Sequence, residues 1–136
     1  MTAIEKIQNA VKKARETEEN SGFPYLAECL RQAGVLKNQW FLPAAQSIYW
    51  TENETVIVQN EPMKTGMISV SEFSADDLIT AIRQNQAGET EFDAFLSAIF
   101  EAGCISYEID FEARSCTYFG ATGENYIEQY PAVQAD

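Results

Sequence analysis

The side chains that could do chemistry in this 136-residue chain are carboxylates, tyrosines and lysines, because the sequence contains no histidine. Without an imidazole, serine and cysteine nucleophiles lack their usual base, and His-ligated metal sites cannot form. Glu108 and Asp110 have the most suggestive spacing, since alternation along a strand would place both carboxylates on one face, about 6.5 Å apart. That separation suits paired acid and base work, yet alternating acidic residues on a solvated strand are also ordinary. We assign no catalytic residue, and the sequence leans away from an enzyme.

Cysteine and cofactor chemistry finds no support in the motifs. Cys29, Cys104 and Cys116 form no CxxC pair and leave an odd thiol, so they are expected to be free and buried. Neither a GxxxxGK[ST] loop nor a GxGxxG loop occurs in the chain. The sequence therefore predicts no cofactor and no thiolate metal site.

The charge is strongly acidic, with 21 Asp and Glu against 9 Lys and Arg and a net charge of −12. Such a chain repels phosphate backbones and shows no basic patch, so nucleic-acid binding is not expected. A minor alternative is a phage-related DNA mimic that occupies a nucleic-acid-binding protein. Three acidic residues of one polar connection could collect a divalent cation but are more often simply solvated, and no metal is predicted there: Glu16, Glu18 and Glu19.

Hydropathy places the chain among cytoplasmic proteins. No stretch approaches the roughly 18 apolar residues of a membrane span, and the first residues lack the basic and then apolar order of a signal peptide. We expect a cytoplasmic protein without membrane contact.

The sequence contains an internal repeat, so the helices and strands that position the polar side chains are expected to occur twice. Phe92 lies sixty-nine positions after Phe23, Gly103 lies the same distance after Gly34, and the segment between them aligns without a gap. This spacing predicts a single domain over 1–136 that is made of two repeats, at about 2–60 and 74–130.

Helix signals open each repeat. Thr2 with Glu5 is a capping box, and Ser74 and Thr90 are predicted N-caps of later helices. Gly34 and Gly103 are predicted to end the second helix of their repeats.

Strands follow each of these glycines, because the apolar period changes to two. Alternation over 106–111 predicts a strand that turns at 113–114, which would place Phe111 opposite Cys116. The chain from Pro131 onward is expected to be a loose tail. Further strands are predicted at 39–42, 47–50, 55–58, 67–70, 116–119 and 125–128.

Hairpins rather than crossover helices connect these strands, so the predicted fold class is α+β. It is an internal duplication of a helix-helix-β-meander unit, with two helical pairs packed on antiparallel sheet.

Several short motifs carry a family resemblance. Tyr-Glu-Ile-Asp at 107–110, Cys-Thr-Tyr-Phe-Gly at 116–120 and Phe-Pro at 23–24 resemble the bacterial domain-of-unknown-function family 1398, whose members are often labelled phage envelope protein. The resemblance covers nearly the whole chain and implies no catalytic or binding residue. The chain departs from it at 51–54, where relatives tend to repeat the Tyr-x-Gly-x-x-Gly turn found at 118–123.

Phe41, Ile48 and Trp50 are the candidate interaction surface, because they fall on the strand face opposite Trp40 and Leu42. If no other element covers them, they predict a protein partner or a homodimer. The favoured function is thus a non-catalytic protein-interaction or regulatory module. The alternative is a small-molecule-binding protein, or an enzyme that uses tyrosine and carboxylate groups in the groove between the repeats.

Overall fold

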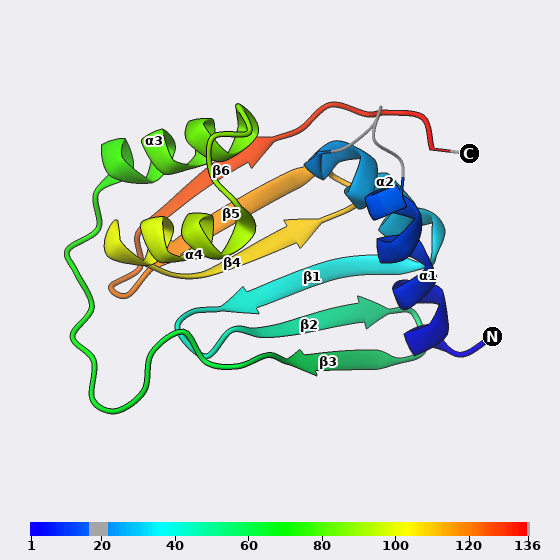
Figure 1. The fold of residues 1–136 in the computed structure, drawn as a ribbon, viewed down its shortest axis with the longest axis horizontal. Coiled ribbons are helices and arrows are strands. Elements are labelled where there is room, and N and C mark those ends of the chain that lie inside the picture. Colours follow the sequence, from blue (N-terminus) through cyan, green and yellow to red (C-terminus); the bar gives the residue numbers. More distant parts are fainter. Residues whose placement is uncertain (17–21, 136) are drawn as a thin grey trace.

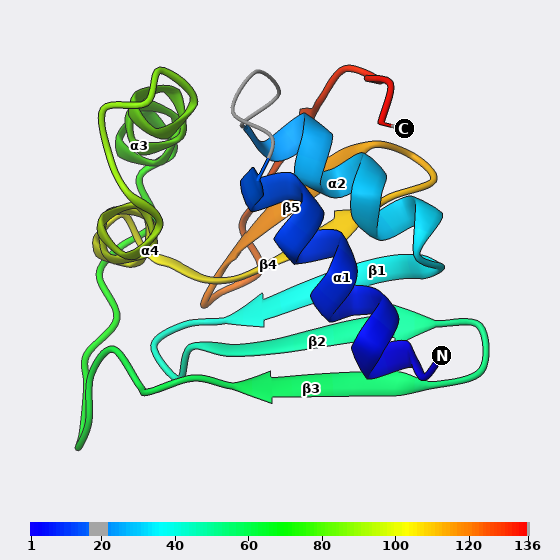
Figure 2. The same ribbon diagram turned by 45° about the vertical axis from the view of Figure 1, so that its right-hand side comes forward.

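The computed structural model describes residues 1–16 and 22–135, which form an α+β fold. One antiparallel sheet of six strands, in the order β3-β2-β1-β4-β5-β6, carries two helical pairs on one face (Figures 1 and 2). The first repeat contributes α1 (Ala3–Glu16), α2 (Phe23–Gln32), β1 (Val35–Phe41), β2 (Gln46–Thr51) and β3 (Thr55–Gln59). The second contributes α3 (Ala75–Gln86), α4 (Phe92–Glu101), β4 (Cys104–Asp110), β5 (Ser115–Gly120) and β6 (Asn125–Gln129).

The predicted duplicated unit is confirmed in the order and bounds of these elements. The bounds of α4, β4 and β5 are those of α2, β1 and β2 plus sixty-nine. The first helix and the third strand depart from this offset. The α3 helix begins seventy-two positions after α1, and the turn between β5 and β6 is one residue longer than the turn between β2 and β3.

A pseudo-twofold axis relates the two halves of the sheet and passes between β1 and β4. These strands pair antiparallel, and Gln39 lies directly opposite Glu108, the residue sixty-nine positions later. The repeats therefore meet in the middle of the sheet at equivalent positions.

The helix ends follow the sequence signals in most cases. The Glu5 N–H donates to Thr2 Oγ1 at 3.1 Å, the Thr2 N–H donates to Glu5 Oε1 at 3.3 Å, and Ser74 Oγ accepts from the Asp77 N–H at 3.2 Å. The predicted Thr90 cap is wrong: Glu91 is the N-cap of α4 and makes no side-chain cap bond.

Two strand predictions are also wrong. Residues 67–70 form no strand. The second hairpin has a four-residue loop from Phe111 to Arg114, so Ile109 rather than Phe111 lies opposite Cys116. The slip is an even number of residues, and the same side chains therefore still face the core.

The core lies between the sheet and the helices. Its fully enclosed side chains include Leu78 from α3, Ile99 from α4 and Phe111 from the second hairpin. All three cysteines are free and buried, as predicted. Burial raises the pKa of Cys104 to about 11 and that of Cys116 to about 12, so both remain neutral thiols.

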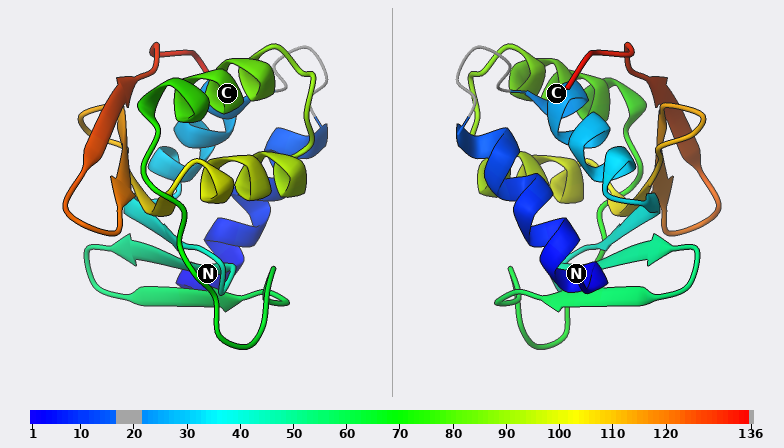
Figure 3. Two further views of the ribbon diagram at one scale, coloured as in Figure 1. Left: turned by 90° about the vertical axis from the view of Figure 1, so that its left-hand side faces the viewer. Right: turned by 90° about the vertical axis from the view of Figure 1, so that its right-hand side faces the viewer.

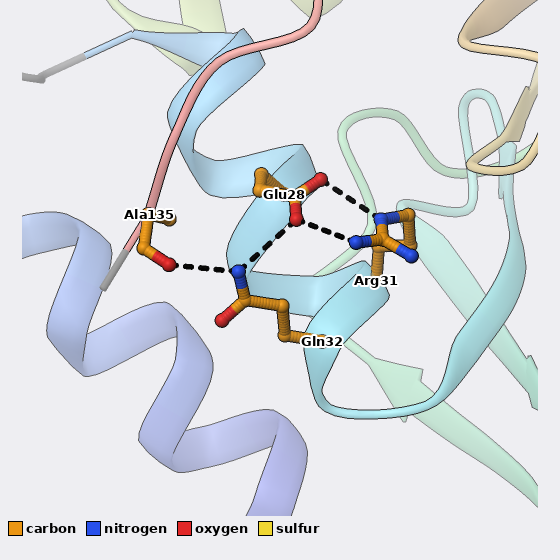
Figure 4. Close-up of polar contacts among 4 residues, drawn as sticks. All are labelled: Glu28, Arg31, Gln32 and Ala135. Atoms are coloured by element: carbon orange, nitrogen blue, oxygen red, sulfur yellow. Dashed lines mark hydrogen bonds and ion pairs between the residues drawn. The ribbon is translucent and has the colours of Figure 1, made fainter.

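The C-terminal segment is not the loose tail that the sequence predicts. Ala135 is buried, and its carbonyl accepts a 2.7 Å hydrogen bond from Gln32 Nε2 of α2 (Figure 4). Glu28 on the same helix binds Gln32 and is held by Arg31 through two contacts of 2.9 and 2.7 Å. This cluster ties the end of the chain to the first helical pair.

Candidate functional site

The outward face of the sheet is the surface opposite the helices. Figure 3 shows both helical pairs on one side of the sheet, and none of the described elements lies on the other side. Phe41, Trp50 and Ile57 on this face are 38%, 40% and 58% exposed, and Ile48 is half-buried. We call these four residues the outward patch.

The strand register makes the outward patch continuous. Ile48 of β2 lies opposite Ile57 of β3, and Trp50 follows two residues later on the same strand face. Phe41 lies on β1 at a diagonal position from Ile48. The sequence placed Phe41, Ile48 and Trp50 on one face, but Ile57 was missed, although alternation within 55–58 could have indicated it.

A polar chain joins the outward patch to the second repeat. Trp50 Nε1 donates to Gln39 Oε1 at 3.0 Å, and Gln39 Nε2 donates to Glu108 Oε2 at 3.0 Å. Lys37 Nζ lies 3.2 Å from the other Glu108 oxygen. These contacts border a shallow hollow and hold the indole in place at its polar edge.

Charge is nearly absent from the outward positions of β1, β2 and β3. These positions hold Lys37, Gln39, Phe41, Gln46, Ile48, Trp50, Thr55, Ile57 and Gln59. None of them is acidic, although the chain as a whole carries a net charge of −12. The sole cation among them is already paired with Glu108. Depletion of charge around aromatic residues is typical of the centre of a protein interface.

Glu108 and Asp110, the carboxylate pair considered for catalysis, both form hydrogen bonds or ion pairs within the sheet and its hairpin. Glu108 is bound by Lys37 and Gln39, and Asp110 Oδ1 accepts the N–H groups of Glu112 and Ala113 at 3.0 Å each. Asp110 therefore caps the hairpin loop, and Glu108 links β4 to β1.

Of the three acidic residues in the connection between the first two helices, only Glu16 lies among the described residues. Glu16 lies 4.0 Å from Lys12 in an exposed pair. Glu18 and Glu19 lie outside the described residues.

Aromatic rings fill the contact between the repeats on the helical side of the sheet. Trp40 of β1 packs edge-on against Phe92 of α4 at 5.1 Å and stacks on Tyr107 of β4 at 6.2 Å. Burial raises the pKa of Tyr107 and of Tyr118 well above the usual range, so neither hydroxyl is suited to act as a base near neutral pH. Tyr107 and Tyr118 belong to the hydrophobic core, and Trp40 packs against it.

Comparison with known proteins gives the family. The model of the family described as "Protein of unknown function (DUF1398)" matches residues 6–129. The chain belongs to this family. Similar proteins are the Uncharacterized protein Mb2035 of Mycobacterium bovis and the Uncharacterized protein Rv2012 of Mycobacterium tuberculosis. Each is 46% identical over 114 residues, which covers 84% of this chain and 70% of the relative.

Family membership leaves the biochemical role open. Among the described residues, none of the helices is both long and apolar enough to cross a membrane.

Proposed function

We propose that the protein is a non-catalytic protein-interaction module whose outward patch binds a second copy of the same chain. The observation that carries the proposal is the combination of exposed Phe41, Trp50 and Ile57 with the absence of acidic side chains from the outward positions of β1, β2 and β3. Two copies of a chain with a net charge of −12 repel one another over most of their surfaces. The outward positions of β1, β2 and β3 add no acidic side chain to such a contact, and their exposed apolar side chains favour burial.

The area of the sheet sets the extent of such a contact. With a strand spacing of about 4.8 Å and a rise of about 3.3 Å per residue, three strands present roughly 300 Å² of flat area, and six strands present roughly 600 Å². A stable dimer buries about 800 Å² of accessible surface on each partner. The contact therefore extends from the outward patch across β4, where the outward carboxylates of Glu108 and Asp110 are already bonded within the chain. It reaches β5, where Phe119 is a half-buried outward residue.

Sedimentation velocity of Trp50→Ala tests this proposal. Removal of a central indole costs about 2 kcal/mol or more of binding, which weakens the dimer by a factor of about 30. We expect the variant to sediment as a monomer at concentrations where the wild type is a dimer, with an unchanged circular dichroism spectrum. Met67→Ala is the control, because Met67 is fully exposed in the loop between β3 and α3 and the loss of its side chain should change nothing.

Two results would refute the proposal. One is a wild-type protein that remains monomeric at every concentration. The other is a folded Trp50→Ala variant with the wild-type dimer constant. Should Trp50→Ala fail to fold, Ile57→Gln repeats the test at a more exposed member of the outward patch.

A further inference from the structure

The β3 strand is an open edge of the sheet. It is the terminal strand in the sheet order, and no described strand pairs with it on its outer side (Figure 1). Four of its five residues are exposed, and its sequence Thr-Val-Ile-Val-Gln has no charge, no proline and three consecutive β-branched apolar residues. Edge strands of this kind are templates for pairing with another chain.

The hydrogen-bond pattern identifies the backbone groups that are available. The Asn60 N–H donates to the Ala45 carbonyl at 3.2 Å, and the Thr51 N–H donates to the Glu54 carbonyl at 2.9 Å. Because bonded pairs alternate along an antiparallel ladder, Val56 and Val58 direct their backbone groups toward β2. The N–H and C=O groups of the intervening residues point away from the sheet: Thr55, Ile57 and Gln59.

The opposite edge of the sheet is protected by charge. In β6, Glu128 forms a 2.6 Å ion pair with Arg83 of α3 and also accepts a hydrogen bond from the Tyr126 hydroxyl. A charged side chain within an edge strand discourages the addition of another strand. The pseudo-equivalent edge at β3 has no such device.

Acidic side chains flank β3 at both ends. Glu52 and Glu54 precede the strand and Glu61 follows it, and all three are exposed. Among the ion pairs of the described residues, none involves these three carboxylates. The edge is therefore an uncharged apolar strand with unpaired negative charge at each end.

This charge pattern disfavours a second copy as the added strand. Two β3 strands paired antiparallel about Ile57 would place Glu54 of one copy opposite Asn60 of the other, next to Glu61. Like charges would then meet at both ends of the pair, which is destabilising. A strand with cations at its ends would instead be attracted by the carboxylates at both ends of β3.

We propose that β3 takes up an extended segment of a partner protein as a seventh strand of the sheet. The segment has β-branched or other apolar residues at alternate positions and carries Lys or Arg at both ends. The backbone groups of Thr55, Ile57 and Gln59 supply the hydrogen bonds, and the three flanking carboxylates select the charge. The site differs from the contact between copies in the proposed function, since it uses the backbone edge of β3 rather than outward side chains. Ile57 contributes its backbone to the edge and its side chain to the outward patch.

A labelled peptide tests this site directly. The probe is fluorescein-labelled Lys-Arg-Val-Thr-Val-Thr-Val-Arg-Lys, and its binding is followed by fluorescence polarisation. We expect saturable binding that weakens as salt is added, together with slowed hydrogen exchange at the Thr55, Ile57 and Gln59 amides. The same peptide with Glu at both ends, and a peptide with the same basic ends and proline at alternate central positions, should not bind. Equal binding of the proline peptide would show attraction to net charge alone and would overturn the proposal.

A matched pair of variants locates the site. Ile57→Pro removes an outward N–H without breaking the bonds to β2, and Ile127→Pro is its counterpart on β6, where the replaced side chain is also 58% exposed. We expect Ile57→Pro to weaken peptide binding at least tenfold and Ile127→Pro to leave it unchanged. The opposite result, or equal effects of both variants, would overturn the assignment to β3.

A charge variant keeps the test decisive if Ile57→Pro does not fold. The triple variant Glu52→Gln, Glu54→Gln and Glu61→Gln leaves the strand intact and should weaken peptide binding at least tenfold. Unchanged binding would refute the charge selection. Trp50→Ala should retain peptide binding even where it disrupts the contact between copies, so the failure of one proposal can be told from the failure of the other. A wild-type dimer that dissociates in Ile57→Pro but not in Ile57→Gln, which loses the same apolar side chain and keeps the backbone N–H, would show a second copy at β3 instead.

Discussion

Gly34 and Gly103 offer a matched test of the packing between the helical layer and the sheet. Each follows the second helix of its repeat, with φ of 97° at Gly34 and 93° at Gly103. A side chain in this left-handed region costs about 1 kcal/mol at either site. The surroundings differ, because a Cβ on Gly34 would meet nothing within 4 Å, whereas a Cβ on Gly103 would lie 2.6 Å from the Phe73 Cα and 2.8 Å from the Glu72 oxygen.

The contact at Gly103 cannot relax by a side-chain rotation, since the neighbouring atoms belong to the backbone. The segment that enters α3 is fixed there by the Ser74 N–H, which donates to the Ala102 carbonyl at 2.8 Å. Forcing it aside costs about 2 kcal/mol, in the range of overpacking. We expect Gly34→Ala to lower the free energy of unfolding by about 1 kcal/mol and Gly103→Ala to lower it by about 3 kcal/mol.

Urea unfolding followed by circular dichroism measures this difference. A loss larger by about 2 kcal/mol places the midpoint of Gly103→Ala about 1 M below that of Gly34→Ala. Equal losses for the two variants would refute the argument, because they would mean that the segment before α3 does not constrain the end of α4.

Two further predictions concern polar groups. The Arg31 side chain and a second hydrogen bond, from Gln32, hold the pKa of Glu28 at about 2 instead of 4.5. The ionised carboxylate therefore stabilises the fold above pH 4.5, and this contribution is lost as the pH falls through 2. Glu28→Gln should lower the free energy of unfolding by about 1 kcal/mol at pH 7, after a discount for the exposure of Arg31, and the difference measured by urea unfolding should vanish in acid. Asn38 is buried and accepts the Trp40 indole N–H at 3.0 Å, so Asn38→Ala should cost about 2 kcal/mol in the same assay, and an effect no larger than that of the exposed Gln129→Ala would contradict this role.

The sequence predicted those features that depend on local chemistry. The capping box at Thr2 and the glycine ends of α2 and α4 involve only neighbouring residues, and each lies where it was predicted. The second hairpin loop was predicted two residues too short. Its left-handed position, with a φ of 52°, is occupied by Arg114 and not by the glycine that usually signals such a turn. Its equivalent Ala45 adopts 55°, so both repeats share this loop although neither sequence shows the usual signal.

The surroundings of the outward patch depend on long-range pairing and could not be predicted. Alternation placed Phe41 and Trp50 on one face but could not say whether a second layer covers them. The pairing of β1 with β4 decides this, since it merges the two meanders into one sheet and sends both helical pairs to the same side. Ile57 joins the outward patch because the pairing of β2 with β3 sets it directly opposite Ile48.

The pairing of Gln39 with Glu108 also bears on the history of the chain. A half-length ancestor that assembled through β1 about a true twofold axis would set this position against itself, so a glutamate there would face a second glutamate. Fusion of the two copies into one polypeptide releases each side to change alone, and the present amide-to-carboxylate bond is an arrangement that two identical subunits cannot make. Covalent linkage thus permits a loss of exact symmetry at the axis, and the two sheet edges differ in the same way, with a charged side chain in β6 and none in β3.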